Sequence, residues 1–427
     1  MTVVTVVVMI VIPLPTPLLD IFMAINLVLA LLIFLIVLFS LAVRLCILAI
    51  RFCWKQPAET KSPNPEEAEM SPVVSLDTLS LELGFGLIPL VDLEKGTELP
   101  ERVHRIRREF ALDLGLVIPR IRIIGNLRLE PFEYCFKIQG VDVGRGKLRM
   151  GHYLCINPGE VKDELDGEKT REPAYGLPAL WVSEDKRNEA ERAGYTVADP
   201  LSVIATHLTN IIKCHAPEIL DRQKTQSILD TLGKDYPAVV GEVQKILTLG
   251  QIHKVLQSLL REQISIRNMV AILEALVDYG PAATKAAKDI QFLNEKARQA
   301  LSRQICLQYA TEDRVLRVLT LSQSLEQKIR DSAVETSSGI VSAMDSLTRT
   351  VWIKALSQSV AAVQDQGWHP LLLCSEEARF LVKSSTEREL PDLAVLSVPE
   401  IVSDITVEVV GEVKIEGETA DNDESLK

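Results

Sequence analysis

The sequence lacks the short motifs that mark the common enzyme classes. It contains no GxSxG nucleophile elbow. Residues 140–147 resemble a phosphate loop, but Leu148 stands where that loop needs a hydroxyl residue, and residues 167–170 insert a glutamate between glycine and lysine. We therefore expect hairpin turns in place of ATP hydrolysis, and we predict neither enzyme activity nor a cofactor.

Clustered metal ligands and paired cysteines are also lacking. His152 lies near Cys155 and His215 follows Cys214, but neither pair has the usual spacing of zinc ligands. We therefore predict no metal site. Beyond the first 54 residues the cysteines are odd in number, widely spaced and without a CxxC pair, which is typical of reduced thiols in a cytosolic protein; they are Cys135, Cys155, Cys214, Cys306 and Cys374.

Positive charge is scarce after the amino-terminal region. The formal net charge is −12, and because residues 1–56 carry three positive charges and one negative charge, the remainder carries −14. Binding to nucleic acid needs a basic surface that displaces counterions from phosphates. The acidic balance excludes that class and favours protein partners.

Long apolar runs are confined to the first 54 residues. Residues 21–43 contain no formal charge, and these 23 residues reach roughly 35 Å as a helix, enough to cross a bilayer. Arg44, Arg51 and Lys55 follow this run, so the positive-inside rule puts the rest of the chain in the cytoplasm. The sequence thus predicts a membrane-anchored protein.

The number of membrane crossings stays open. Pro13, Pro15 and Pro17 break any helix, and residues 1–12 alone reach only about 18 Å. This stretch is either half of a re-entrant pair or the stub of a first span that starts upstream. A cleaved secretory signal is not expected, because no basic residue precedes the apolar region.

The remaining sequence predicts a proline-rich linker followed by mixed α/β structure. Residues 56–72 contain four prolines and four acidic residues without apolar periodicity. Helix signals dominate from Asp199 to about residue 305, with Ser265 as the expected cap of a helix over 266–279. Strands are expected at 75–84 (half-buried), 120–124, 133–143, 314–321, 370–374 and 393–398, with helices over 97–115 and 350–364 and an acidic tail over 411–427.

Residues 172–181 have an unusual composition, with Tyr175, two prolines and Trp181 after a charged stretch. In one interpretation the two aromatic side chains fill a packed corner of the core. In the other they form a shallow apolar site, rimmed by Glu172, for the apolar face of a partner helix. The residues alone leave both interpretations open.

Several long segments resemble one protein family. Residues 14–26, LPTPLLDIFMAIN, look like the amino-terminal signature of the FHIPEP family, the large export-gate proteins of bacterial flagellar and injectisome type III secretion. Further similarity lies at residues 81–92, 156–160, 193–200, 203–208 and 264–276. The resemblance covers nearly the whole region after the linker, and it favours the flagellar branch over the injectisome branch.

The resemblance implies an α+β cytoplasmic region of four subdomains that is attached to an amino-terminal transmembrane helix. It also implies a location at the bacterial inner membrane, with the cytoplasmic region assembled into a nine-membered ring below the export channel. The expected parts are an anchor at 1–54, a linker at 55–72, a first subdomain at 73–150 plus 200–219, a second at 151–199, a helical third at 220–299, an α/β fourth at 300–410 and a tail at 411–427.

The family's chaperone-docking site implies particular residues and partners here. Its motif positions correspond to Glu172, Tyr175 and Thr206, with Pro158 and Val203 in the wall. The implied partners are export chaperone–substrate complexes and other export apparatus proteins, including the ATPase complex.

One departure limits what the resemblance implies. The family's further transmembrane helices and its PGKQMAID-like segment are missing between about residues 44 and 57, so no ion-coupling role is assigned. The alternative function is a non-transporting adaptor or regulator derived from an export gate protein.

Overall fold

The computed structural model describes residues 77–91, 98–159, 161, 165–282, 287–336 and 339–415, together with residues 25, 27, 28, 30 and 32–34. The chain divides into two compact units, Met1–Ser75 and Leu76–Lys427, which are treated separately. In the first unit the described residues are helical and exposed. No helix within the described residues is both long and apolar enough to cross a bilayer, and most of the predicted span at 21–43 lies outside them.

The second unit begins with a four-stranded sheet in the order β2-β1-β3-β4. The central strand β1 (Leu79–Leu83) pairs parallel with β2 (Arg122–Gly125) and antiparallel with β3 (Glu133–Ile138), and β4 (Val141–Lys147) pairs antiparallel with β3. The 3-10 helix η1 (Phe85–Leu90) follows β1. The helix α3 (Glu98–Asp113) buries Leu99, Val103, Ile106 and Phe110.

A second, antiparallel sheet has the order β6-β7-β5-β8 and is inserted before the chain returns to the first sheet. It is made of β5 (His152–Ile156), β6 (Glu168–Arg171), β7 (Pro178–Ser183) and β8 (Thr196–Ala198), with η2 (Glu184–Lys186) and α4 (Arg187–Ala193) between the last two. Its small core contains Cys155, Val182, Ala190, Ala193 and Tyr195. The helix α5 (Pro200–Cys214) then packs against α3 and β5.

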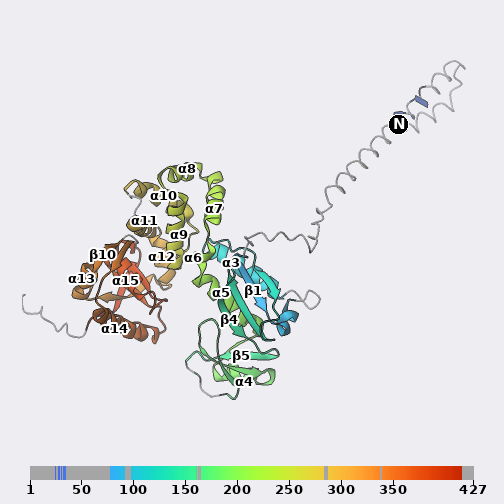
Figure 1. The fold of residues 1–427 in the computed structure, drawn as a ribbon, viewed down its shortest axis with the longest axis horizontal. Helices are drawn as coiled ribbons and strands as arrows, with labels where there is room; N and C mark the ends of the chain where they lie inside the picture. The colour runs from blue at the N-terminus through green and yellow to red at the C-terminus, as the bar shows by residue number, and fades with distance from the viewer. Residues whose placement is uncertain are drawn as a thin grey trace, which may run out of the picture. The chain divides into compact units, whose positions relative to one another are not determined.

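A helical segment follows, and Figure 1 labels most of its members. It comprises α6 (Ala216–Ile219), α7 (Arg222–Asp235), α8 (Pro237–Ile246), α9 (Leu249–Arg261), α10 (Met269–Tyr279), η3 (Gly280–Ala282), α11 (Ala287–Ala300) and α12 (Ser302–Tyr309). The helix α9 has a full capping box at Thr248 and Gln251 and buries one apolar face.

The last sheet is parallel, in the order β13-β12-β9-β14. Its strands are β9 (Val315–Leu321), β12 (Leu371–Cys374), β13 (Ala394–Ser397) and β14 (Thr406–Val413). The connections contain α13 (Gln323–Asp331), the hairpin β10 (Ala333–Thr336) and β11 (Gly339–Ser342), α14 (Ser346–Gln364), α15 (Glu376–Thr386) and η4 (Val398–Glu400). Trp352 is fully buried in this core.

Several expectations from sequence need correction. The single strand at 133–143 is divided into β3 and β4 by a turn at residues 139 and 140. The strand at 75–84 is not half-buried, because β1 lies inside the sheet and all five of its residues are buried. Ser265 does not cap α10, which begins at Met269; its hydroxyl donates instead to the backbone oxygen of Asp113 at 2.5 Å. The strand β14 crosses the expected start of the acidic tail at 411, because Gly411, Glu412 and Val413 still pair with β9. Residues 416–427 lie outside the described part of the chain.

A buried cluster of charged side chains joins the helical segment to the last sheet, and nothing in the sequence indicated it. Arg379 on α15 donates to Glu295 on α11 at 2.5 Å and to Glu262 at 2.7 Å. Arg298 donates to the same Glu262 oxygen at 2.7 Å and to Glu400 at 2.6 Å. Both arginines are at most 2% exposed, so their charge is compensated by these carboxylates and not by water.

Candidate functional site

A tight turn between β6 and β7 presents Tyr175 to solvent. The Glu172 carboxylate accepts hydrogen bonds from the backbone N–H of Ala174 at 2.8 Å and of Tyr175 at 2.6 Å. Gly176 has a φ of +70° and its N–H donates to the Glu172 backbone oxygen at 2.9 Å. These bonds fix the turn. Tyr175, at the tip of the turn, is 59% exposed.

The position of Glu172 differs from the expected charge on a rim. Its side chain is buried, with 3% exposure, and its carboxylate oxygens are occupied by the two backbone donors. A carboxylate buried without partners would be costly, and these charge-assisted bonds offset that cost. Glu172 therefore shapes the turn from beneath, and Tyr175 is the exposed member. Trp181, by contrast, fills the core as the packed-corner interpretation expected.

The helix α5 supplies Thr206. The side chain of Asp199 caps the helix by accepting from the N–H of Ser202 at 3.3 Å, and Pro200 occupies the first turn, as the sequence predicted. Thr206 is exposed, whereas Val203 is only 2% exposed and packs in the core. One turn after Thr206, the Asn210 side-chain amide donates to the Ala174 backbone oxygen at 2.6 Å. This bond brings α5 against the Tyr175 turn.

Pro158 lies at the same end of the second sheet as the turn. The pairing of β5 with β7 places Ile156 opposite Ala179, and the N–H of Asn157 donates to the backbone oxygen of Pro178 at 2.9 Å. Pro158 is exposed. Leu177, which the sequence interpretation did not single out, is 42% exposed and directly precedes β7. An alternation of apolar and polar residues could not indicate Leu177, because Leu177 belongs to a turn and not to a strand.

A buried polar pair lies beneath this surface. The Tyr134 hydroxyl and His207 Nδ1 are 2.9 Å apart, and both side chains are buried. Burial lowers the pKa of His207 to about 4. Burial, and to a lesser extent the charge of Glu172, raises the pKa of Tyr134. His207 is therefore neutral at pH 7, and the pair forms one neutral hydrogen bond.

The glycines of the rejected phosphate loop have a packing role. Residues 139 and 140 form the β3–β4 turn with positive φ, so the hairpin turn expected at 140–147 lies only at its first residue, and residues 141–147 form β4. The hairpin turn expected at 167–170 was wrong, because Glu168–Arg171 is the strand β6. Gly144 and Gly146 face α5 and Tyr134: a Cβ atom at Gly144 would lie 2.6 Å from Ile211 Cδ1, and one at Gly146 would lie 2.4 Å from the Tyr134 hydroxyl. Because these two glycines lack a side chain, β4 can approach the buried pair of Tyr134 and His207 closely.

Replacing Gly144 with alanine is expected to lower the free energy of unfolding by about 1–3 kcal/mol, because the added methyl group overpacks the interface with α5. Gly241→Ala is the matched control. Gly241 lies inside α8 with open space around its Cα, so the same change is expected to stabilise by about 0.5–1 kcal/mol. Urea unfolding of both variants measures the difference. Equal effects of the two substitutions would contradict the packing role of Gly144.

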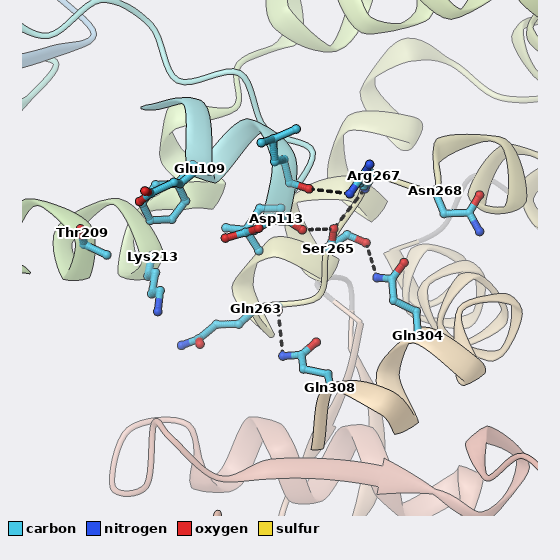
Figure 2. Close-up of a pocket in the computed structure, with 13 residues that line it drawn as sticks. Glu109, Asp113, Thr209, Lys213, Gln263, Ser265, Arg267, Asn268, Gln304 and Gln308 are labelled. Atoms are coloured by element: carbon cyan, nitrogen blue, oxygen red, sulfur yellow. Dashed lines mark hydrogen bonds between the residues drawn. The ribbon is translucent and has the colours of Figure 1, made fainter. Parts of the chain in front are cut away.

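A cavity of about 830 Å³ lies next to α5 and is drawn in Figure 2. Its walls include Thr209 and Lys213 of α5, and Ser265 joins Asp113 to Gln304 through hydrogen bonds of 2.5 and 2.9 Å. The lining carries charges of both signs, with Glu109 and Asp113 against Lys213 and Arg267. It therefore does not select a ligand of one charge.

Comparison with known sequences identifies a family. The FHIPEP family profile matches residues 40–406. The flagellar biosynthesis protein FlhA of Borreliella burgdorferi is 47% identical over 350 residues, covering 82% of this chain and 50% of the relative. FlhA of Treponema pallidum is 48% identical over 357 residues, covering 83% and 50%. The chain thus spans about half the length of the curated relatives it matches.

Solved structures agree in fold. The Chlamydia pneumoniae CdsV protein is similar with a TM-score of 0.70 and 25% identity, over 80% of this chain and 99% of that one. The nonameric EPEC SctV-C structure is similar with a TM-score of 0.64 and 20% identity, over 80% and 99%. These similarities show that the mixed α/β unit described above has the fold of these two proteins, and the profile match covers most of the sequence. The chain belongs to the FHIPEP family.

Proposed function

We propose that this chain is a component of the bacterial flagellar type III export apparatus and provides a cytoplasmic docking platform for chaperone–substrate complexes. The observation that carries the proposal is the exposed Tyr175 on a fixed turn that Asn210, one helical turn after Thr206, joins to α5. A partner helix that laid its apolar face on Tyr175, Leu177 and Pro158 would bury apolar surface worth on the order of 25 cal/mol per Å² before ordering costs. In this proposal the chain acts by binding its partners.

The flagellar branch is supported by the degree of similarity. The curated relatives described above are flagellar proteins at 47–48% identity, whereas the CdsV and SctV-C structures are 25% and 20% identical. The injectisome counterpart is therefore the less supported alternative.

The proposal extends to assembly and location. The solved SctV-C relative is described as nonameric, which supports a nine-membered ring for this chain too. The apolar run at 21–43 supports anchoring in the bacterial inner membrane with the second unit on the cytoplasmic side. Further proposed partners are other export apparatus proteins, including the ATPase complex.

The roles proposed for the five site residues differ. Tyr175, Thr206 and Pro158 are exposed and would contact the partner. Glu172 and Val203 are buried, so their contribution would be to hold the turn and α5 in shape.

Replacing Tyr175 with aspartate is expected to weaken binding of a purified export chaperone–substrate complex at least about tenfold. A charge at the centre of an apolar contact removes the anchoring aromatic and adds a desolvation cost. Tyr175→Phe keeps the ring and is expected to bind like the parent. Titration calorimetry with the full chain in detergent measures the affinities.

Tyr236→Asp is the matched control, because Tyr236 is 47% exposed at the junction of α7 and α8, outside the site. It is expected to leave binding unchanged. The proposed site is wrong if a folded Tyr175→Asp variant binds as tightly as Tyr236→Asp.

A second function, a non-transporting adaptor or regulator, is favoured by one observation: only about 30 residues separate the signature-like residues 14–26 from the linker at 56–72, with no room for the family's further transmembrane helices. Expression in a strain that lacks its full-length relative separates the two functions. Restored motility supports the export component, and binding of the chaperone complex without motility supports the adaptor.

A further inference from the structure

Asn210 makes a contact that the proposed site does not yet use. Its side-chain Nδ2 donates to the Ala174 backbone oxygen at 2.6 Å, across 36 residues of sequence. Ala174 directly precedes Tyr175 in the turn. Within the described part of the chain, this is the hydrogen bond that connects α5 to residues 172–176.

The internal bonds of the turn determine its shape but not its position. The Glu172 carboxylate and the Gly176 N–H act within the turn itself. They would persist if the turn moved away from α5 as a unit. The position of Tyr175 relative to Thr206 therefore depends on contacts between the turn and the helix.

The orientation of the Asn210 amide is set by a second partner. The Cys214 thiol, one turn further along α5, donates to Asn210 Oδ1 at a distance of 3.7 Å. This bond holds the amide oxygen toward Cys214 and so directs the nitrogen toward Ala174. Thr206, Asn210 and Cys214 are spaced four residues apart and follow one side of the helix.

We propose that Asn210 is a positioning residue for docking: it holds the Tyr175 turn against α5 so that Tyr175 and Thr206 form one continuous surface for a partner helix. The inference rests on the proposed function. Asn210 is half-buried, and its role is to place the two contacting side chains.

The test replaces Asn210 with aspartate, which has nearly the same shape but loses the donor when ionised. At pH 7.5 the carboxylate would face the Ala174 oxygen and repel it, so affinity for the purified chaperone–substrate complex is expected to fall about tenfold. Half-burial and the facing Ala174 oxygen favour the protonated form of the introduced carboxyl, so they raise its pKa above the ordinary value of about 4. A protonated carboxyl can donate again, so we expect part of the loss to be recovered as the pH is lowered from 7.5 to 5.5, when each affinity is divided by that of the parent at the same pH.

Two further variants make the result specific. Asn210→Ala lacks a donor at every pH and is expected to show the loss without recovery. Asn188→Asp changes an exposed amide on α4 and is expected to bind like the parent throughout. Unfolding midpoints of all variants at pH 7.5 are expected to agree with the parent, because the exposed turn contributes little to the core.

The inference is overturned if Asn210→Asp binds like the parent at pH 7.5, or if its loss is the same at every pH. Tyr175→Asp, measured in the same series, separates a failure of the proposed site from a failure of the positioning role of Asn210. If Tyr175→Asp binds normally, the proposed site itself fails. If Tyr175→Asp loses binding and Asn210→Asp does not, only the positioning role fails.

Discussion

Replacing Arg379 with methionine is expected to lower the free energy of unfolding by about 3–5 kcal/mol. The arginine is fully buried and donates to both Glu262 and Glu295. Methionine fills a similar length but leaves the buried Glu295 without its arginine partner and leaves Glu262 with Arg298 alone, and an uncompensated buried charge is among the most costly single changes. Urea unfolding, followed by tryptophan fluorescence, measures the loss, since Trp352 belongs to the same buried core as the apolar residues of α15.

Arg349→Met provides the control on the same part of the fold. Arg349 forms an exposed pair with Glu389 at 3.7 Å, with both side chains more than 40% exposed. Exposed ion pairs contribute about 0–1 kcal/mol, so this variant is expected to stay close to the parent. Similar losses for Arg349→Met and Arg379→Met would contradict the role assigned to the buried cluster.

Within this cluster, Glu262 predicts a direction for acid sensitivity. Burial alone would raise the pKa of Glu262, but the charges of Arg298 and then Arg379 outweigh it and lower the pKa to about 2. Because this folded-state pKa lies below the unfolded value near 4.5, the group stabilises above pH 4.5 and loses its contribution as the pH falls toward 2.

His207 is expected to make the protein lose stability at a milder pH. Its folded-state pKa of about 4 lies below the ordinary 6.5, so the unfolded chain binds the proton first. Stability is complete above pH 6.5 and falls as the pH drops toward 4. Between pH 7 and pH 5 the expected loss is up to about 2 kcal/mol, from about 1.4 kcal/mol per pKa unit.

His207→Gln removes the titrating group and is expected to flatten this pH dependence while costing stability at pH 7, where the bond to Tyr134 is lost. The measurement is the difference in unfolding free energy between pH 7 and pH 5 for both proteins. Parallel curves would contradict the assignment. Because His207 lies on the buried face of α5, acid is also expected to loosen the proposed docking surface before it reaches the Glu262 cluster.

Local patterns predicted many elements well. Asp199 and Pro200 marked the start of α5, and its apolar positions Leu201, Ile204, Leu208 and Ile211 are all buried. The reason is that a helix cap and an apolar stripe are decided within one or two turns of chain. The strands at 314–321, 370–374 and 393–398 were found for a similar reason, since each is a short apolar run next to turn residues.

The failures involve partners that are distant in sequence. Ser265 has the residue type of a helix cap, but its hydroxyl found an acceptor in Asp113, 152 residues away. The preference of serine for helix starts takes no account of a competing bond to a distant acceptor. The strand β14 was not predicted, and it crosses the expected start of the acidic tail at 411 because its pairing with β9 continues to Val413.

The sequence by itself determined the family resemblance, the acidic balance, the apolar amino-terminal run and the local elements that carry Tyr175 and Thr206. Only the tertiary structure decided that Glu172 is buried beneath the turn, that Asn210 reaches Ala174 and that Arg379 reaches Glu262 across 117 residues. The physical reason is that periodicity reports which side of an element is apolar. Whether a charged or amide side chain on the other side meets water or a buried partner depends on which elements pack there.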